Sequence, residues 1–164
     1  MSEVQIGFAT PADAEAIAVL NRELLAFYEI PPPGSIPAVA EQIRRHGMGA
    51  APGAEVLLAR RWSELIGILI FQEIFSLAAN YRLLFIQDLF VSDRARGKGV
   101  GRKLMLRLGE IARERQIPHI DWTADKWNRG SQRFYRNLGS VLRGEKLVYR
   151  LSADKLGELD KAEK

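Results

Sequence analysis

Arg96-Gly97-Lys98-Gly99-Val100-Gly101 lies between two segments of different periodicity, and this stretch decides the fold. Residues 83–91, which precede it, are rich in apolar and aromatic side chains and predict a mostly buried strand. Residues 102–114, which follow it, repeat apolar side chains at helical spacing and carry charged ones on the other face. The sequence therefore predicts a strand, a glycine-rich loop (the 96–101 loop) and a helix, in that order.

The 96–101 loop has the features of an anion site. The first N–H groups of a helix have no intrahelical partners, and the positive end of the helix dipole lies beside them. Gly97 and Gly99 let the backbone reach positive φ and let a phosphate approach the amides without a Cβ in the way. We therefore expect a ligand that carries phosphate. Five cations surround the same point: Arg94, Arg96, Lys98, Arg102 and Lys103.

Two common nucleotide-binding motifs do not fit this spacing. The dinucleotide fingerprint G-x-G-x-x-G needs a glycine where this chain has Arg102. The P-loop needs Lys-Ser or Lys-Thr directly after its last glycine, and neither pair follows Gly101. A loop chosen only for its turn geometry is the alternative that these residues leave open.

The pattern Arg96-x-x-Gly99-x-Gly101 resembles the pyrophosphate loop Gln/Arg-x-x-Gly-x-Gly/Ala of the GNAT superfamily of N-acetyltransferases. Asp88–Val91, Trp127-Asn128 and Phe134–Gly139 keep the order and spacing of the same family. The resemblance is greatest to its diamine (spermidine/spermine-like) and thialysine acetyltransferase branch. It covers residues 83–150 well, whereas the N-terminal half matches only in the order of its elements.

This resemblance implies acetyl-CoA as co-substrate and no metal. In the family the central strand splays from its neighbour, so the backbone of Phe90 and Val91 would pair with the pantetheine arm and aim an N–H at the thioester oxygen. Asn128 would contact pantetheine, although asparagine is also among the best helix N-caps. The implied cofactor-binding residues are Leu89, Phe90, Val91, Arg96, Gly97, Lys98, Gly99, Val100, Gly101, Arg102, Asn128, Ser131, Phe134 and Tyr135.

The resemblance also implies that Tyr135 donates a proton to the departing thiolate, with a buried aromatic beside Phe134 as the alternative. The branch has a glutamate as its proposed base where this chain has Gln87, and glutamine cannot accept a proton at neutral pH. Asp88 is adjacent, but neighbouring strand residues point to opposite faces, so Asp88 cannot simply replace residue 87. Asp88 could instead attract a cationic amine or pair with the arginines around the loop. Glu73, on the neighbouring strand, is another candidate base.

The order of elements predicts an α/β fold, and the GNAT fold has that order. We expect a single-domain GNAT fold with a mixed central sheet of about seven strands flanked by about four helices. The domain would span residues 1–151, with a charged tail at 152–164 that frays. Strands are expected at 4–9, 55–60, 65–74, 83–91 and 119–123, helices at 12–28, 37–46, 99–115 and 127–139, and two closing antiparallel strands at Val141-Leu142 and Leu147–Leu151.

The composition narrows the function further. A chain of 164 residues with 47% hydrophobic residues is one ordinary domain, and no apolar run or leader-like start indicates a membrane or an export signal, so we expect a cytoplasmic protein. The absence of cysteine excludes disulfides, thiolate zinc sites and an acyl-cysteine intermediate, and two histidines are too few for a metal cluster. The net charge of +4 permits nucleic acid, but the basic residues are not clustered with stacking aromatics, so we expect no nucleic-acid partner.

These observations predict an acetyl-CoA-dependent N-acetyltransferase that acts directly on a primary amine of a small molecule. A protein N-terminus or lysine side chain is the alternative acceptor, and a non-catalytic acyl-CoA-binding regulatory module is the alternative class, favoured by Gln87. Lys126 stands where the diamine branch usually has an acidic residue, which weakens a polyamine acceptor. The resemblance also implies a homodimer.

Overall fold

The computed structural model describes residues 3–48, 53–145 and 147–156. The chain forms two compact units, Met1–Asp125 and Lys126–Lys164. The boundary that the sequence places at residue 151 stays a prediction, and residues 157–164 of the expected tail lie outside the described residues. Within the described ranges, no helix is both long enough and apolar enough to cross a membrane.

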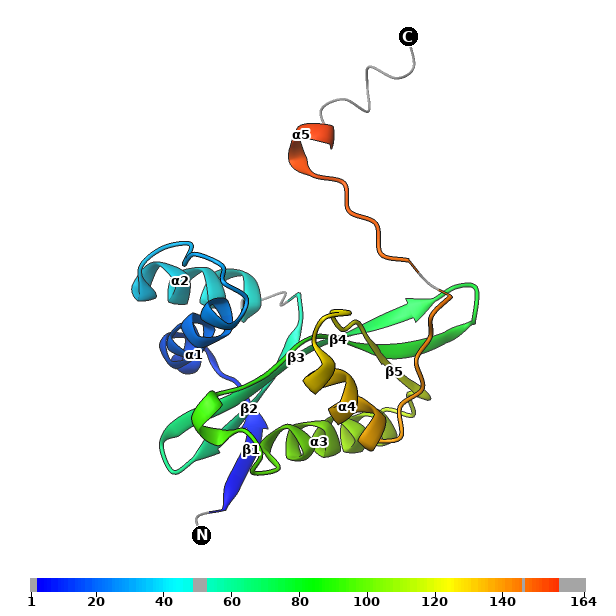
Figure 1. Ribbon diagram of the computed structural model, residues 1–164, viewed down its shortest axis with the longest axis horizontal. Helices are drawn as coiled ribbons and strands as arrows, with labels where there is room; N and C mark the ends of the chain where they lie inside the picture. The colour runs from blue at the N-terminus through cyan, green and yellow to red at the C-terminus, as the bar shows by residue number, and fades with distance from the viewer. Residues whose placement is uncertain (1–2, 49–52, 146, 157–164) are drawn as a thin grey trace. The chain divides into compact units, whose positions relative to one another are not determined.

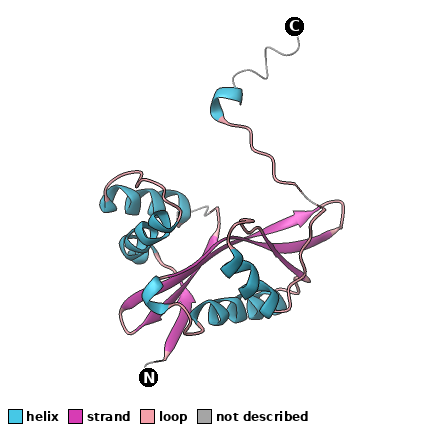
Figure 2. Cartoon of the chain, in the orientation of Figure 1, coloured by secondary structure: helices cyan, strands magenta, loops and turns pink. Residues whose placement is uncertain are grey.

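The first unit holds the sheet and the two longest helices of the described residues (Figures 1 and 2). The second unit holds α4 (Arg129–Asn137) and the short α5 (Ala153–Leu156). The strands of the first unit are β1 (Val4–Phe8), β2 (Glu55–Arg61), β3 (Glu64–Ser76), β4 (Tyr81–Val91) and β5 (His119–Trp122); its helices are α1 (Ala14–Phe27), α2 (Ile36–Gln42) and α3 (Val100–Glu114), with helical turns η1 (Pro11–Asp13), η2 (Ile43–Gly47) and η3 (Asp93–Ala95).

The five strands form one mixed sheet in the order β1-β2-β3-β4-β5. The pairs β1–β2, β2–β3 and β3–β4 are antiparallel, and β5 runs parallel to β4. This arrangement confirms the predicted α/β class, although the described residues contain five strands instead of about seven. The closing strands expected at Val141-Leu142 and Leu147–Leu151 are wrong for a single copy of the chain: both segments lie outside the sheet, with Leu142 92% and Val148 82% exposed. A strand requires a hydrogen-bonded partner strand, and the sheet of this chain does not supply one there.

The sheet has a hydrophobic core on each face. On one side, the α3 face, the buried Leu104 of α3 belongs to the same core as Leu69 of β3. On the other side, the α1 face, Leu20 of α1 belongs to the same core as Ile68 and Phe90. Adjacent residues of β3 therefore belong to different cores, as the alternation of side chains along a strand requires.

The end of α1 is fixed by the residues that follow it. Tyr28 is the C-cap, and Glu29 has a φ of 55°, outside the helical region. Residues 31–33 are prolines, which lack the N–H that a helix needs. The helix therefore stops with Phe27 and Tyr28 at its last turn, and Tyr28 contributes to the site described next.

Candidate active site

A β-bulge in β4 organises the candidate site. Ile70 of β3 pairs with Asp88, whereas the next residue of β3 pairs with Ile86, so Gln87 is the extra residue. Ile86 and Leu89 both pack into the core of the α3 face, so the two residues between them lie on the α1 face. Gln87 and Asp88 are both exposed there. The expectation that these two neighbours point to opposite faces is therefore wrong, because the bulge interrupts the alternation.

Asp88 is a carboxyl group in a shielded position. Burial raises the pKa of this carboxyl above its ordinary value of 3.8, although the residue keeps exposed surface. No neighbouring cation compensates: among the described residues Asp88 forms no ion pair, while Arg96 pairs with Asp93 at 2.8 Å and Arg94 pairs with two glutamates. The alternative in which Asp88 pairs with the arginines around the loop is therefore contradicted. A desolvated, accessible carboxylate of this kind can accept a proton or attract an ammonium group.

Tyr28 and Asp125 lie in the same part of the first unit as Asp88. Burial raises the pKa of the Tyr28 phenol above its ordinary value of 10.0, and the charges of Asp125 and Asp88 and a hydrogen bond to Asp125 raise it further. A phenol from the end of α1 and carboxylates from β4 and from the residues after β5 therefore lie within electrostatic range of one another. Neither Tyr28 nor Asp125 was predicted from the sequence. The only local signal was the position of Tyr28 at the end of a helical pattern, shortly before three consecutive prolines.

The backbone of β4 beyond the bulge has one open side. β5 pairs with β4 only along Leu83–Ile86, so within the described chain the later residues of β4 pair with β3 alone. Phe90 packs into the core of the α1 face, and Leu89 and Val91 pack against the core of the α3 face. Their side chains therefore belong to the core, while their free backbone groups form an edge along which an extended ligand can hydrogen-bond.

The 96–101 loop has the backbone that the sequence predicted. Gly97 and Gly99 have φ values of 72° and 77°, and a Cβ added at either would meet no other atom within 4 Å. The need for glycine is therefore conformational, and the surface above the loop is open. Gly99 is the N-cap of α3 and Val100 is buried, while Arg102 is exposed in the first helical turn. The loop thus presents first-turn N–H groups at a helix N-terminus, an arrangement that favours a phosphate.

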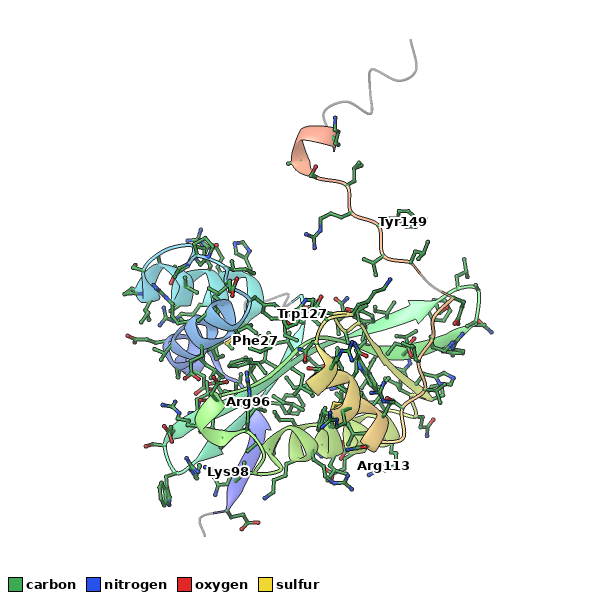
Figure 3. All side chains as sticks on the ribbon, viewed as in Figure 1. Phe27, Arg96, Lys98, Arg113, Trp127 and Tyr149 are labelled. Carbon is green, nitrogen blue, oxygen red and sulfur yellow. The ribbon has the colours of Figure 1, made fainter. Side chains whose placement is uncertain are left out.

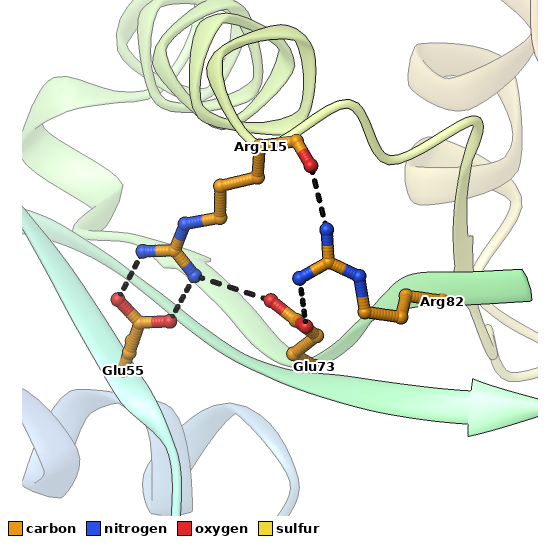
Figure 4. A network of polar contacts seen from close by, with 4 residues as sticks. All are labelled: Glu55, Glu73, Arg82 and Arg115. Atoms are coloured by element: carbon orange, nitrogen blue, oxygen red, sulfur yellow. Dashed lines mark hydrogen bonds and ion pairs between the residues drawn. The ribbon is translucent and has the colours of Figure 1, made fainter.

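Glu73 belongs to a different cluster (Figure 4). It pairs in register with Leu84 and so lies on the α3 face, opposite Gln87 and Asp88. Its carboxylate accepts a hydrogen bond from Arg82 at 2.8 Å and lies 3.8 Å from Arg115. The structure does not bring Glu73 to the bulge, and its contacts indicate a structural ion-pair network.

The second unit carries the remaining predicted residues. The Asn128 side chain accepts a hydrogen bond from the backbone N–H of Ser131 at 3.0 Å, so Asn128 is the N-cap of α4. Tyr135 and Phe134 are half-buried on α4, with ring centroids 5.3 Å apart. The cap and the helix are as predicted, and the roles of these residues toward a ligand stay predictions.

Comparisons with known proteins agree with this geometry. The model of the acetyltransferase (GNAT) family matches residues 18–139. A thialysine N-ε-acetyltransferase of Caenorhabditis elegans is 26% identical over 152 residues, which are 86% of this chain and 85% of the relative. The D-amino-acid N-acetyltransferase HPA3 of Saccharomyces cerevisiae is 34% identical over 68 residues, or 42% of this chain and 41% of the relative. A solved integron cassette protein from the mobile metagenome of Vibrio cholerae, 28% identical, superposes with a TM-score of 0.88 over 98% of this chain and 99% of its own.

Proposed function

Because the chain belongs to the acetyltransferase (GNAT) family, and is thus an acetyl-transferring enzyme, we propose that it transfers the acetyl group of acetyl-CoA directly to a primary amine of a small molecule. The observation that carries the proposal is the bulge, since it leaves Gln87 and Asp88 on one face of the sheet. The charge of Asp88 acts on the Tyr28 phenol there, as the charge of Asp125 does. Relatives named for thialysine and for D-amino acids support a small amine as the acceptor. The homodimer and the cytoplasmic location predicted from the sequence are part of the same proposal.

The donor would bind along the free edge of β4 and at the 96–101 loop. The open backbone at Leu89–Val91 can pair with the amides of a pantetheine arm as a further strand would. The N–H groups at the start of α3 can bind the pyrophosphate. A backbone N–H near the bulge that stabilises the oxyanion of the tetrahedral intermediate would be worth about 2.7–4 kcal/mol.

The acceptor needs help to lose a proton. An alkylamine with a pKa of about 10.4 is only about 0.04% neutral at pH 7, a cost of about 4.6 kcal/mol. Gln87 cannot accept that proton, whereas the Asp88 carboxylate can, directly or through a water molecule. Its raised pKa makes it a stronger base than an ordinary aspartate. Asp88 is therefore the general base of the proposed reaction, and Tyr28 with Asp125 would orient the ammonium group before transfer.

The reaction then proceeds by direct attack. The neutral amine adds to the thioester carbonyl, and the nitrogen of the tetrahedral intermediate loses its extra proton to water. Collapse of the intermediate then breaks the carbon–sulfur bond and releases the amide and the coenzyme A thiolate. Tyr135 of α4 would give this thiolate its proton. A thiol with a pKa near 8.5 already leaves readily at neutral pH, so this proton contributes at the low end of general-acid catalysis, about 10²-fold.

The test is thiol release from acetyl-CoA with a panel of thialysine, ornithine, D-amino acids, polyamines and short peptides at several pH values. Turnover with a free small amine but not with peptides is the expected result. Turnover with peptides alone would favour the protein-acetylating alternative. Tight coenzyme A binding without turnover across the panel would favour the regulatory module instead.

A further inference from the structure

Arg96, the first residue of the 96–101 loop, is held by three structural elements. Its Nε donates to the carbonyl of Val91 at 3.1 Å, and its Nη1 lies 2.8 Å from the Oδ1 of Asp93. Its Cζ lies 4.9 Å from the ring centroid of Phe27, at the end of α1, and 5.5 Å from that of Phe90 (Figure 3). The guanidinium thus connects the donor loop to the last turn of α1 through cation–π contacts.

The last turn of α1 also carries the acceptor residue Tyr28. The rings of Phe27 and Tyr28 meet edge to face, with centroids 5.1 Å apart. Tyr28 in turn lies within electrostatic range of Asp88 and Asp125. A continuous line of contacts inside the first unit therefore runs from Arg96 through Phe27 to the acceptor residues.

Arg96 also has hydrogen-bonding capacity left for a ligand. Within the described chain, its Nε and Nη1 have partners while Nη2 forms no hydrogen bond. Because a guanidinium is planar and rigid, a phosphate oxygen bound at Nη2 would fix the same plane that faces Phe27.

We propose that Arg96 is a positioning residue that couples the donor site to the acceptor site. A donor phosphate at Nη2 holds the guanidinium against Phe27, and Phe27 holds Tyr28 in place for the amine. The proposal rests on the proposed function for the identity of donor and acceptor. Coupling between two sites is reciprocal. Loss of the Phe27 ring must therefore also weaken binding of the donor, although Phe27 acts on Arg96 and does not itself contact the phosphate.

The experiment is a double-mutant cycle on the coenzyme A dissociation constant, measured by calorimetry. Phe27→Leu removes the ring, Arg96→Lys keeps the positive charge but removes the planar guanidinium, and Phe27→Tyr keeps an aromatic ring as the conservative variant. Phe75→Leu, on an exposed aromatic of β3, is the matched control. We expect Phe27→Leu to weaken coenzyme A about two- to fivefold, as the loss of one cation–π contact would. We expect Phe27→Tyr and Phe75→Leu to bind as the wild type, and the double variant to bind no worse than Arg96→Lys alone.

The second readout is the KM of the acceptor for whichever amine of the panel turns over. We expect Arg96→Lys and Phe27→Leu to raise this KM severalfold with kcat nearly kept, because the chemical groups remain. Wild-type affinity for coenzyme A in Phe27→Leu, or fully additive losses in the double variant, would overturn the coupling. The calorimetry does not depend on turnover, so it can be read even if no amine of the panel is acetylated. Non-additive losses in the double variant without any turnover would overturn the proposed function but leave Arg96 as the link from the donor to Phe27. A wild type that does not bind coenzyme A would overturn both.

Discussion

At the scale of single residues, ionised Asp88 lowers the stability of the fold but accepts a proton more readily than an ordinary aspartate does. Its folded-state pKa is raised by burial, so the folded protein prefers the neutral carboxyl and its ionisation at neutral pH opposes folding. The same burial produces a carboxylate that accepts a proton more readily. A residue that destabilises the fold in the state in which it works is typical of a functional site.

The variant Asp88→Asn tests both the effect of Asp88 on stability and its proposed role as the base. We expect kcat to fall about 10²- to 10⁴-fold, since the base is lost. We also expect unchanged or increased thermal stability at pH 7. In the folded wild type, Asp88 is fully protonated well below pH 3.8 and fully ionised well above its raised folded-state pKa. The stability difference between variant and wild type should therefore grow as pH rises through that window, and thermal unfolding at a series of pH values measures it.

The control for this prediction is Gln87→Glu, which adds a second carboxylate beside Asp88 on the same face. If Gln87→Glu restores turnover to Asp88→Asn, a carboxylate at the bulge is what the reaction requires. An Asp88→Asn enzyme with wild-type kcat would exclude Asp88 as the base.

Gly99 decides whether the loop binds phosphate. Both Gly99→Ala and Gly99→Glu place a side chain at a φ of 77°, which costs about 1–2 kcal/mol of stability in either variant. Neither Cβ meets a protein atom, so the two variants differ in what they present to the ligand. We expect calorimetry to show that Gly99→Ala retains coenzyme A binding and that Gly99→Glu abolishes it by adding bulk and negative charge at the pyrophosphate. Equal affinities in the two variants would contradict the assignment of the loop.

At the scale of elements, the Glu55–Arg115–Glu73–Arg82 network fixes the end of α3 to three strands (Figure 4). Arg115 donates to both carboxylate oxygens of Glu55, at 2.5 and 2.6 Å, and lies 3.8 Å from Glu73. The Nη2 of Arg82 donates to the carbonyl of Arg115 at 2.9 Å. The network thus holds the C-terminal end of the helix whose N-terminal end follows the 96–101 loop.

We expect Arg115→Ala to lower the free energy of unfolding by about 1–2 kcal/mol, because a half-buried bidentate pair is lost and Glu55 is left without its cation. The matched control is Arg107→Ala, since Arg107 pairs at 2.9 and 3.1 Å with Glu110 and Glu114 of its own helix. Exposed ion pairs within one helix contribute little to stability, so this variant should unfold nearly as the wild type does. Urea unfolding of both variants makes the comparison, and equal midpoints would show that the network does not hold the helix.

The elements that the sequence predicted best are those whose pattern is local. The helix at 100–114, the strands at 55–61 and 119–122 and the positive φ values of Gly97 and Gly99 follow from side-chain period and glycine chemistry, which nearby residues determine. The bulge at Gln87 was not predictable in this way, because it depends on how β3 and β4 pair. Its position decides which face Asp88 occupies, so missing the bulge also produced the wrong expectation that Gln87 and Asp88 lie on opposite faces.

The proximity of Tyr28 to Asp88 and Asp125 was missed for the same reason. Tyr28 and Asp125 are distant in sequence from Asp88, and only the folded first unit brings their charges and the phenol into range. Glu73 was proposed as a base from its residue type and its place on the neighbouring strand, whereas its register opposite Leu84 puts it on the other face of the sheet. Residue type and local pattern therefore predicted the backbone of the 96–101 loop, while the surroundings of Asp88 required tertiary structure.

At the scale of the whole molecule, the segment from Val141 to Leu151 is the main departure from the predicted fold. Its apolar side chains are 52–92% exposed, and none of its described residues belongs to a strand. Exposed apolar side chains are costly to leave in water, and burying them stabilises by about 25 cal/mol per Å². A segment with the sequence of a strand but no partner strand is suited to pair with another chain.

We therefore expect the protein to be a homodimer in solution, with this segment buried against a second copy, as the family resemblance also implies. Light scattering after gel filtration measures the mass. We expect Leu142→Lys or Val148→Lys to raise the dimer dissociation constant at least about tenfold, because a charge on a buried apolar surface costs more than 1.4 kcal/mol. Leu77→Lys, at a position 84% exposed after β3, is the control and should leave the dimer intact. A monomeric wild type at micromolar concentration would show that the segment is covered in some other way, and a dimer that survives both substitutions would place the interface elsewhere.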